Sequence, residues 1–197
     1  MAIPARLVAL TVLAAAAVGV GTWGTLRYLD RHRHAPLPSA DTGAAPPGAP
    51  GEARRIKATL FYVAADGMQL APSERDVLFA DSPSEQGKRI IEALLGPAPS
   101  GLVSAIPPGT TLRGLYVGQH GDAYVDFGTS LRTNHPGGSQ NEILTVYAII
   151  SALTTNLPAI TSVQILVDGH EIDTLAGHVD LRRPLPPSRQ WMGKGTT

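Results

Sequence analysis

The chain has 197 residues, 16 Lys and Arg against 16 Asp and Glu, and no cysteine. A length of this kind fits one folded domain with additional segments. The absence of cysteine excludes disulfide bonds, thiolate metal ligands, a cysteine nucleophile and a lipid-modified cysteine. The net charge of zero hides three unlike parts: residues 1–56 contain six basic and three acidic side chains, residues 57–187 contain eight and thirteen, and residues 188–197 contain two and none. The acidic middle part argues against a nucleic-acid partner.

A run of twenty residues without charge extends from Leu7 to Leu26. As an α-helix it would be about 30 Å long, which is the thickness of the hydrocarbon core of a bilayer. The run therefore predicts a membrane anchor, which residues 1–34 form together with its flanks. A cleaved signal peptide is an alternative, because Arg6 precedes the run, but a signal core usually has only about 7–15 apolar residues. A helix buried in a folded core is a third interpretation, and the lack of a polar face argues against it.

The flanks of this run differ in charge. Arg27, Arg31 and Arg33 follow the run, whereas only Arg6 and the amino group precede it. The positive-inside rule by itself would therefore keep the residues after the run in the cytoplasm.

Residues 35–56 are predicted to be a linker. Positions 35–53 read APLPSADTGAAPPGAPGEA, in which five Pro, three Gly and six Ala leave little apolar surface to bury. Such a segment stays extended and, at about 3.1 Å per residue, reaches on the order of 60 Å. The last ten residues, 188–197, follow the Pro-rich sequence RRPLPP and are predicted to be a disordered tail.

Residues 57–187 are predicted to form one folded domain, because about 130 residues can bury roughly two thirds of their surface. The domain begins with two extended segments. The first, residues 57–65, is rich in β-forming residues and ends at the turn dipeptide Asp66-Gly67. The second comprises residues 68–70 and 74–80.

A helix is predicted to begin at Pro83 and to end near Leu95. Ser82 and Glu85 have the spacing of a capping box, and Pro is favoured at the first helical position. Gly96 follows the last apolar residue of the helix, as is typical of a helix end. Strands are then predicted at residues 112–117 and 123–127, joined as a hairpin through residues 119–122.

A second helix, about residues 140–156, follows a loop at residues 132–138. Ser139 and Glu142 again have capping-box spacing. Apolar residues occupy most of the circumference of this helix, so it is predicted to be the central helix of the core.

A strand at residues 162–167 follows, and it ends at the turn dipeptide Asp168-Gly169. A further short extended piece is predicted near residues 178–181. The order ββαββαβ(β) predicts an α+β fold in which a small mixed sheet carries two helices packed on one face.

The ordered motifs of this domain resemble the GerMN domain family, which is named after a bacterial spore-germination protein. The resemblance extends from Thr59 to Pro184. It rests on four segments in family order: LFYVAADGMQL, EALLGPAPSGLVSAIPPGTTL, YVDFG and GGSQNEILTVYAIISALTTNLPAITSVQILVDG. The best-studied members carry two copies in tandem, whereas this chain has room for one.

The resemblance implies a non-enzymatic module on the outer side of the cytoplasmic membrane. Some members help to build the channel between mother cell and forespore, others lie beside signalling or cell-wall proteins, and the fold is similar to ring-building domains of envelope-spanning machines. Other members are lipoproteins held by a cysteine, an anchor that residues 7–26 would replace here. The implied topology is single-pass with the C-terminal domain outside. It conflicts with the flanking arginines, but the long linker favours it.

No catalytic, cofactor-binding or metal-binding residue is predicted. Ser139 lacks the G-x-S-x-G context of a nucleophile and is expected to cap a helix. Asp126 and Asp168 resemble a carboxylate pair, although Asp-Gly is ordinary turn chemistry. The remaining candidates lack the spacing of a zinc site; they are His32, His34, His170, Glu171, His178 and Asp180.

Three functional hypotheses follow. The first is a membrane-anchored protein that contacts envelope proteins or a second copy of itself, through strand edges and the loops at residues 97–108 and 132–138. The second is an envelope binding module for peptidoglycan or a small ligand. The third is a hydrolase, which a pocket lined by Asp126, Asp168 and His178 would favour.

Overall fold

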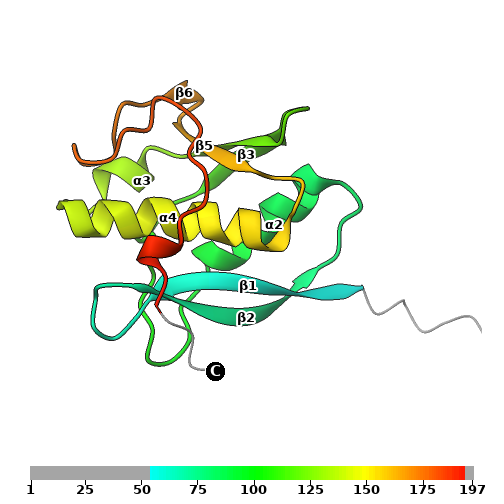
Figure 1. Ribbon diagram of the computed structural model, residues 1–197, viewed down its shortest axis with the longest axis horizontal. Helices are drawn as coiled ribbons and strands as arrows, with labels where there is room; N and C mark the ends of the chain where they lie inside the picture. Colours follow the sequence, from blue (N-terminus) through cyan, green and yellow to red (C-terminus); the bar gives the residue numbers. More distant parts are fainter. Residues whose placement is uncertain (1–53, 194–197) are drawn as a thin grey trace, which may run out of the picture. The chain divides into compact units, whose positions relative to one another are not determined.

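The computed structural model describes residues 54–193, so the predicted anchor at residues 7–26 and nearly all of the predicted linker lie outside the described residues. Within residues 54–193, no helix combines the length and apolar character that a membrane crossing requires. The elements, shown in Figure 1, are β1 (Arg55–Val63), β2 (Leu70–Leu78), α2 (Pro83–Leu95), β3 (Leu112–Val117), β4 (Asp122–Phe127), α3 (Ser130–Thr133), α4 (Ser139–Asn156), β5 (Ser162–Val167), β6 (His170–Glu171) and the 3-10 turn η1 (Arg189–Trp191).

The strands form two sheets. β1 and β2 make an antiparallel pair, and the other sheet has the order β3-β4-β5-β6, in which β4 and β5 run parallel. Helices α2 and α4 lie between the two sheets, with β1 and β2 on one side and β3 and β5 on the other (Figure 1). The predicted α+β class is confirmed, but the prediction of one mixed sheet with both helices on one face is wrong.

The character of α4 explains the two-sheet arrangement. Apolar side chains surround most of this helix, and Leu144, Val146, Ile149 and Leu153 are each at most 1 % exposed. One sheet can cover only one side of a helix, so an apolar helix of this kind needs a partner on its other side as well. α4 packs against β1 of the smaller sheet and against β5 of the larger one.

Helix α2 begins as predicted and approaches the larger sheet closely. The Ser82 side chain accepts a hydrogen bond from the main-chain N–H of Glu85, 3.2 Å away, so this cap is confirmed. A Cβ at Gly87 would lie 3.0 Å from the methyl carbons of Leu115 on β3. The glycine therefore costs helix propensity but lets the helix backbone pack against the sheet.

The second predicted segment is one continuous strand, β2, that passes through Pro72. Pro72 pairs with Phe61 of β1. The main-chain groups of Leu70, two residues earlier, point away from β1, because the Leu70 carbonyl accepts a hydrogen bond from Gly193 N–H at 2.8 Å. Pro72 has the same orientation in the strand, so its missing N–H removes no bond to β1.

Both ends of the folded domain differ from the prediction. Arg55 and Ile56, assigned to the linker, belong to β1. Residues 188–193, assigned to a disordered tail, include η1 and pack on the domain, with the ring of Trp191 centred 6.2 Å from that of Tyr147. The Trp191 ring supplies an apolar contact that a Pro-rich composition does not reveal.

The last strand is also displaced from its predicted position. Residues 178–181 form no strand, and β6 at His170–Glu171 pairs with β5 instead. The connecting turn consists of Asp168 and Gly169, whose φ angles of 51° and 78° are both positive. Such a two-residue turn matches the twist of a hairpin, and it favours Asp-Gly because both positions need positive φ.

Candidate functional site

The predicted carboxylate pair exists, but an arginine joins its members. Arg113 Nε lies 3.0 Å from Asp126 Oδ2, and Arg113 Nη1 lies 3.4 Å from Asp168 Oδ1. The other oxygen of Asp126 accepts a hydrogen bond from Gly169 N–H at 2.7 Å. These contacts fix the turn after β5 against β4 and β3, so the two carboxylates stabilise the sheet.

The capping box predicted at the start of α4 does not form. The residue before the helix is Gly138, with a φ of 83°, and no side chain caps the first turn. Ser139 is the first helical residue and is exposed, and Glu142 turns away from it. The prediction is wrong because Glu142 has partners from a distant part of the chain.

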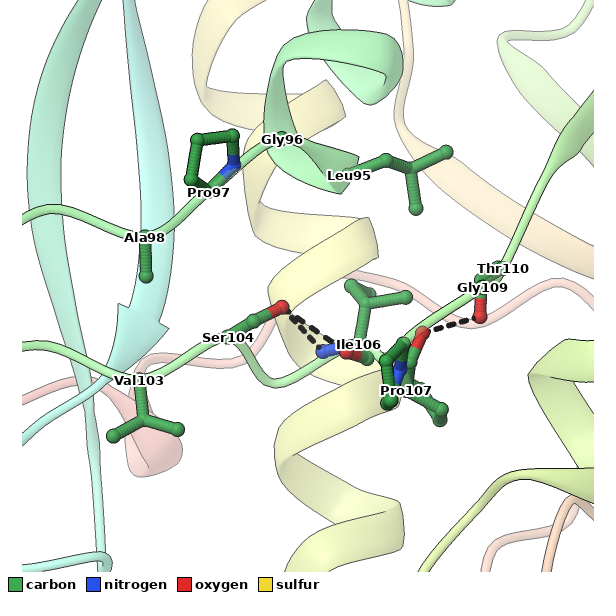
Figure 2. Close-up of a pocket in the computed structure, with 11 residues that line it drawn as sticks. Leu95, Gly96, Pro97, Ala98, Val103, Ser104, Ile106, Pro107, Gly109 and Thr110 are labelled. Atoms are coloured by element: carbon green, nitrogen blue, oxygen red, sulfur yellow. Dashed lines mark hydrogen bonds between the residues drawn. The ribbon is translucent and has the colours of Figure 1, made fainter.

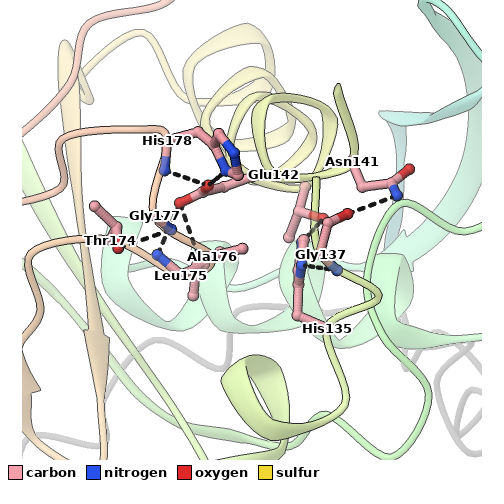
Figure 3. A network of polar contacts seen from close by, with 10 residues as sticks. His135, Gly137, Asn141, Glu142, Thr174, Leu175, Ala176, Gly177 and His178 are labelled. Atoms are coloured by element: carbon pink, nitrogen blue, oxygen red, sulfur yellow. Dashed lines mark hydrogen bonds and ion pairs between the residues drawn. The ribbon is translucent and has the colours of Figure 1, made fainter. Parts of the chain in front are cut away.

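Glu142 is fully buried and holds the loop at residues 174–178 (Figure 3). Its Oε1 accepts hydrogen bonds from Leu175 N–H at 2.8 Å and from Ala176 N–H at 3.0 Å. Its Oε2 accepts one from His178 N–H at 2.8 Å and lies 3.1 Å from the ring Nδ1 of His178. A charged group without water is tolerated when its oxygens are saturated in this way.

The pKa of the Glu142 carboxyl reflects two opposing effects. Burial raises its pKa, because the charged form loses its hydration. The main-chain N–H groups of Ala176, His178, Val179 and Leu175 bind the charged form and together bring the pKa below its ordinary value. Glu142 is therefore a carboxylate at neutral pH.

The residues proposed for a hydrolase do not meet. Asp126 and Asp168 are bound to Arg113, while His178 is bound to Glu142. None of these residues lines either of the two cavities described below. Across residues 54–193, no cluster of three or more His, Asp or Glu is placed to hold a metal ion. His32 and His34 lie outside the described residues.

The two loops predicted as contact surfaces converge on one cavity, which we call the loop groove. It has a volume of about 440 Å³. The turn between β1 and β2 and the start of α4 complete its walls, and no charged side chain lines it. The lining residues are Val63, Ala64, Ala65, Gly67, Val103, Ser104, Ala105, Ile106, Pro107, Pro108, Asn134, Pro136, Asn141, Leu144 and Thr145.

A second cavity of similar volume shares lining residues in the segment 103–108 with the loop groove (Figure 2). It is lined only by residues 95–110, so it is the inner side of a single loop. Ser104 Oγ exchanges hydrogen bonds of 3.1 Å with the N–H and carbonyl of Ile106, and Thr110 Oγ1 donates to the Pro107 carbonyl at 2.7 Å. These bonds support the segment that lines both cavities.

A chain of hydrogen bonds ties both loops to α4, and Figure 3 shows its His135 end. Gly137 N–H donates to His135 Nδ1 at 3.0 Å. Thr145 Oγ1 donates to the Ala105 carbonyl at 2.6 Å, which leaves this oxygen to accept from His135 Nε2 at 3.2 Å. All three contacts are satisfied by a neutral imidazole with its proton on Nε2.

The rim of the loop groove is apolar and exposed. Val103 lines the groove and is 62 % exposed, and Ala65, in the turn between β1 and β2, also lines it and is exposed. Asn134 supports the opposite wall, because its Nδ2 donates to the Pro108 carbonyl at 2.9 Å. A shaped cavity with an apolar rim and a few polar groups suits a binding surface better than a catalytic site.

Sequence reasoning located the two loops but missed Thr145, which connects them, and assigned Glu142 to a helix cap instead of to the loop at residues 174–178. Thr145 and Glu142 are polar residues that α4 buries among apolar ones. Buried polar groups almost always have hydrogen-bond partners. These two positions were therefore the available signal that segments distant in sequence pack against α4.

Comparison with known proteins places the domain in a family. The family model Germane, described as sporulation and spore germination, matches residues 59–173. The chain belongs to this family. A search of curated proteins finds no match. The GerMN resemblance of the sequence is thus confirmed.

Solved structures support the same fold. The chain is similar to the tandem GerMN domains of the sporulation protein GerM from Bacillus subtilis, with a TM-score of 0.52 and 16 % identity over 69 % of this chain and 47 % of that one. It is also similar to the first GerMN domain of the same protein, with a TM-score of 0.51 and 19 % identity over 68 % of this chain and 98 % of that one. The chain thus spans about half of the tandem structure and nearly all of the single domain.

The family match covers the loop groove but ends before two features of this GerMN domain. All residues that line the groove fall within residues 59–173. The loop at residues 174–178, which Glu142 holds, and the turn η1 come after the matched range.

Proposed function

We propose that this GerMN-domain protein is attached to the cytoplasmic membrane and acts, without catalysis, by binding another protein of the cell envelope through the loop groove. The observation that carries the proposal is the convergence of the loops at residues 97–108 and 132–138 on one apolar cavity of about 440 Å³. Interfaces concentrate their binding energy in shaped apolar pockets of this kind. The family description, sporulation and spore germination, supports a role in the assembly or signalling of the envelope.

The attachment and topology rest on the sequence. Residues 7–26 contain no charge and suffice to cross a bilayer as a helix, and the linker at residues 35–56 could carry the domain on the order of 60 Å from it. A domain on the outer side, at the end of such a linker, would reach partners in the cell wall or in a facing membrane.

Photo-crosslinking in intact cells tests the groove. A photoreactive amino acid would replace Val103 at the groove rim in the full chain. The matched control replaces Tyr116 on β3, which is outside the groove and 65 % exposed, close to the 62 % of Val103. We expect a discrete adduct with another protein from position 103 and none from position 116. Equal adducts from both positions, or none from position 103, would contradict the proposal.

The mass of the adduct separates two kinds of partner. An adduct of twice the chain mass identifies a second copy of this chain, and any other discrete mass identifies a different envelope protein. Both support a protein-binding groove.

A second candidate function is the binding of peptidoglycan or a small ligand. The volume of the loop groove lies within the range of small-molecule sites, and Asn134 and Asn141 contribute polar groups to its wall. Retention of the purified full chain on peptidoglycan, lost on Val103→Asp, would favour this function over protein binding.

A further inference from the structure

His135 connects the two loops that form walls of the loop groove to helix α4. The ring lies between Gly137 in its own loop and Thr145 on α4, and Thr145 in turn binds the Ala105 carbonyl in the opposite loop. His135 is half-buried, and Thr145 is 1 % exposed. One connection between the walls therefore runs through a single imidazole that uses both of its nitrogens, and the hydrogen bond from Asn134 Nδ2 to the Pro108 carbonyl is another.

This arrangement requires an unprotonated Nδ1. Gly137 N–H is a donor and can only be bound by a lone pair, which Nδ1 supplies in the neutral ring. A proton added at Nδ1 would place two N–H groups against each other at a separation of 3.0 Å between the nitrogens. The loop at residues 132–138 must then move to relieve the repulsion, and the loop residues that line the groove move with it.

One ionisable group, the carboxylate of Glu142, acts directly on the charge of the His135 ring. Glu142 on α4 is a carboxylate and favours protonation of the ring, and His178 lies beyond it, bound to its Oε2. Residues 97–108 include no ionisable side chain. Arg132 on α3 is exposed.

Burial of the ring is the largest influence, and it outweighs Glu142 and the Asn141 backbone to bring the pKa of His135 below its ordinary value. The ring is therefore neutral at neutral pH and becomes protonated only under acid conditions. As the pH falls, the same histidine in the unfolded chain would bind its proton first.

We propose that protonation of His135 detaches the loop at residues 132–138 from Thr145 and Gly137 and so remodels the loop groove, which binds its partner at neutral pH and loses it in acid. The consequence for the partner rests on the proposed function of the groove. The change in the loops does not rest on that function, because it involves only contacts within the domain.

Imidazole NMR tests the first step on the full chain, labelled with 15N in its six histidines. At about pH 7.5 we expect the His135 ring to be neutral with its proton on Nε2 and to have a pKa below the ordinary value of 6.5. A proton on Nδ1 at neutral pH, or a His135 pKa at or above 6.5, would overturn the proposal.

Hydrogen exchange of the main-chain amides tests the second step. Between about pH 7.5 and about pH 5, and after correction for intrinsic rates, we expect exchange of the amides at residues 103–106, 135, 137 and 138 to rise by about tenfold. The variant His135→Asn, whose side-chain oxygen can accept from Gly137 N–H but does not titrate, should abolish the rise. The control His120→Asn should retain it. A rise that persists in His135→Asn, or no rise in the unchanged chain, would overturn the proposal.

Crosslinking from position 103 at both pH values completes the test. Loss of the adduct in acid, with recovery in His135→Asn, supports control of the partner by this histidine. The same loss in His135→Asn as in the unchanged chain would overturn that control. Absence of an adduct at both pH values would contradict the proposed function alone, because the exchange experiment contains no partner.

Discussion

Glu142 on α4 and His178 in the loop after β6 are joined by two contacts, although 36 positions separate them in the chain. The His178 N–H donates to Glu142 Oε2 at 2.8 Å, and the ring Nδ1 lies 3.1 Å from the same oxygen. The carboxylate is fully buried, whereas the histidine side chain is 44 % exposed. The loop at residues 174–178 is thus attached to the central helix through a single buried charge.

Replacement of this charge should destabilise the fold. In Glu142→Gln, one side-chain oxygen remains an acceptor, but the amide NH₂ would face the N–H groups that now bind Oε2. We expect the free energy of unfolding to fall by about 3 kcal/mol, as for a broken buried charge network. Urea denaturation of the full chain measures it. Glu85→Gln, an exposed acid in α2, is the matched control and should change stability less. Equal losses in both variants would contradict the role of Glu142.

The stability of the domain should also depend on pH through Glu142. The pKa of Glu142 in the folded domain lies below its ordinary value of 4.5. The unfolded chain therefore binds the proton first, so the contribution of Glu142 is complete above about pH 4.5 and is lost as the pH falls through the folded pKa. Urea midpoints should be measured at several pH values from neutral to about pH 3. The midpoint of the unchanged chain should fall as the pH falls, and the midpoint of Glu142→Gln should fall less. Parallel curves would contradict this prediction.

Asn156 should contribute to stability at the outer edge of β1. Its Oδ1 accepts from Thr59 N–H at 2.8 Å, and its Nδ2 donates to the Thr59 carbonyl at 2.7 Å. The amide thus occupies the place of a neighbouring strand and blocks pairing at this position. Asn156→Ala should lower the free energy of unfolding by about 2 kcal/mol and raise exchange of the Thr59 amide.

The variant Asn156→Asp distinguishes the contribution of one hydrogen bond from that of the other. Its carboxylate can still accept from Thr59 N–H but cannot donate to the Thr59 carbonyl, so we expect protection of the Thr59 amide with partial loss of stability. If neither variant alters exchange at Thr59, the side chain does not cover this edge.

The 3-10 turn η1 should stabilise the domain through Trp191. Trp191→Ala removes the ring that packs on Tyr147, and we expect a loss of about 1 kcal/mol in the free energy of unfolding. Gly193 N–H holds the Leu70 carbonyl at the edge of β2, so exchange of the Gly193 amide should rise in the same variant. Arg189→Ala, in the same turn, is the control. An unchanged melting midpoint in Trp191→Ala would show that the turn contributes nothing.

A charge at the groove rim should abolish partner binding without unfolding the domain. Val103→Asp places a carboxylate at a side chain that is 62 % exposed, where it costs little in the free protein but must lose its hydration in a complex. We expect the crosslinked adduct from a photoreactive group at Ala65, an exposed residue that lines the groove, to disappear, with an unchanged urea midpoint. Tyr116→Asp is the matched control and should keep the adduct. Retention of the adduct in Val103→Asp would exclude the rim as a contact.

Local patterns in the sequence predicted most of the elements. Ser82 caps α2 and Asp168-Gly169 turns the chain into β6, because each needs only its immediate neighbours. The same reasoning failed at Ser139, where capping-box spacing was present but Glu142 was bound to main-chain groups more than thirty residues later. A local motif forms only when no distant partner binds its side chain more strongly.

The sequence by itself determined the α+β class, the positions of both long helices and the two loops that make the groove. Only the tertiary structure decided that the strands divide into two sheets, that the loops meet, and that His135, Thr145 and Ala105 join them. The physical reason is the reach of the forces involved. Hydrophobic periodicity acts over a few residues, whereas the covering of α4 on all sides and the saturation of its buried polar groups bring together parts of the chain that no local pattern connects.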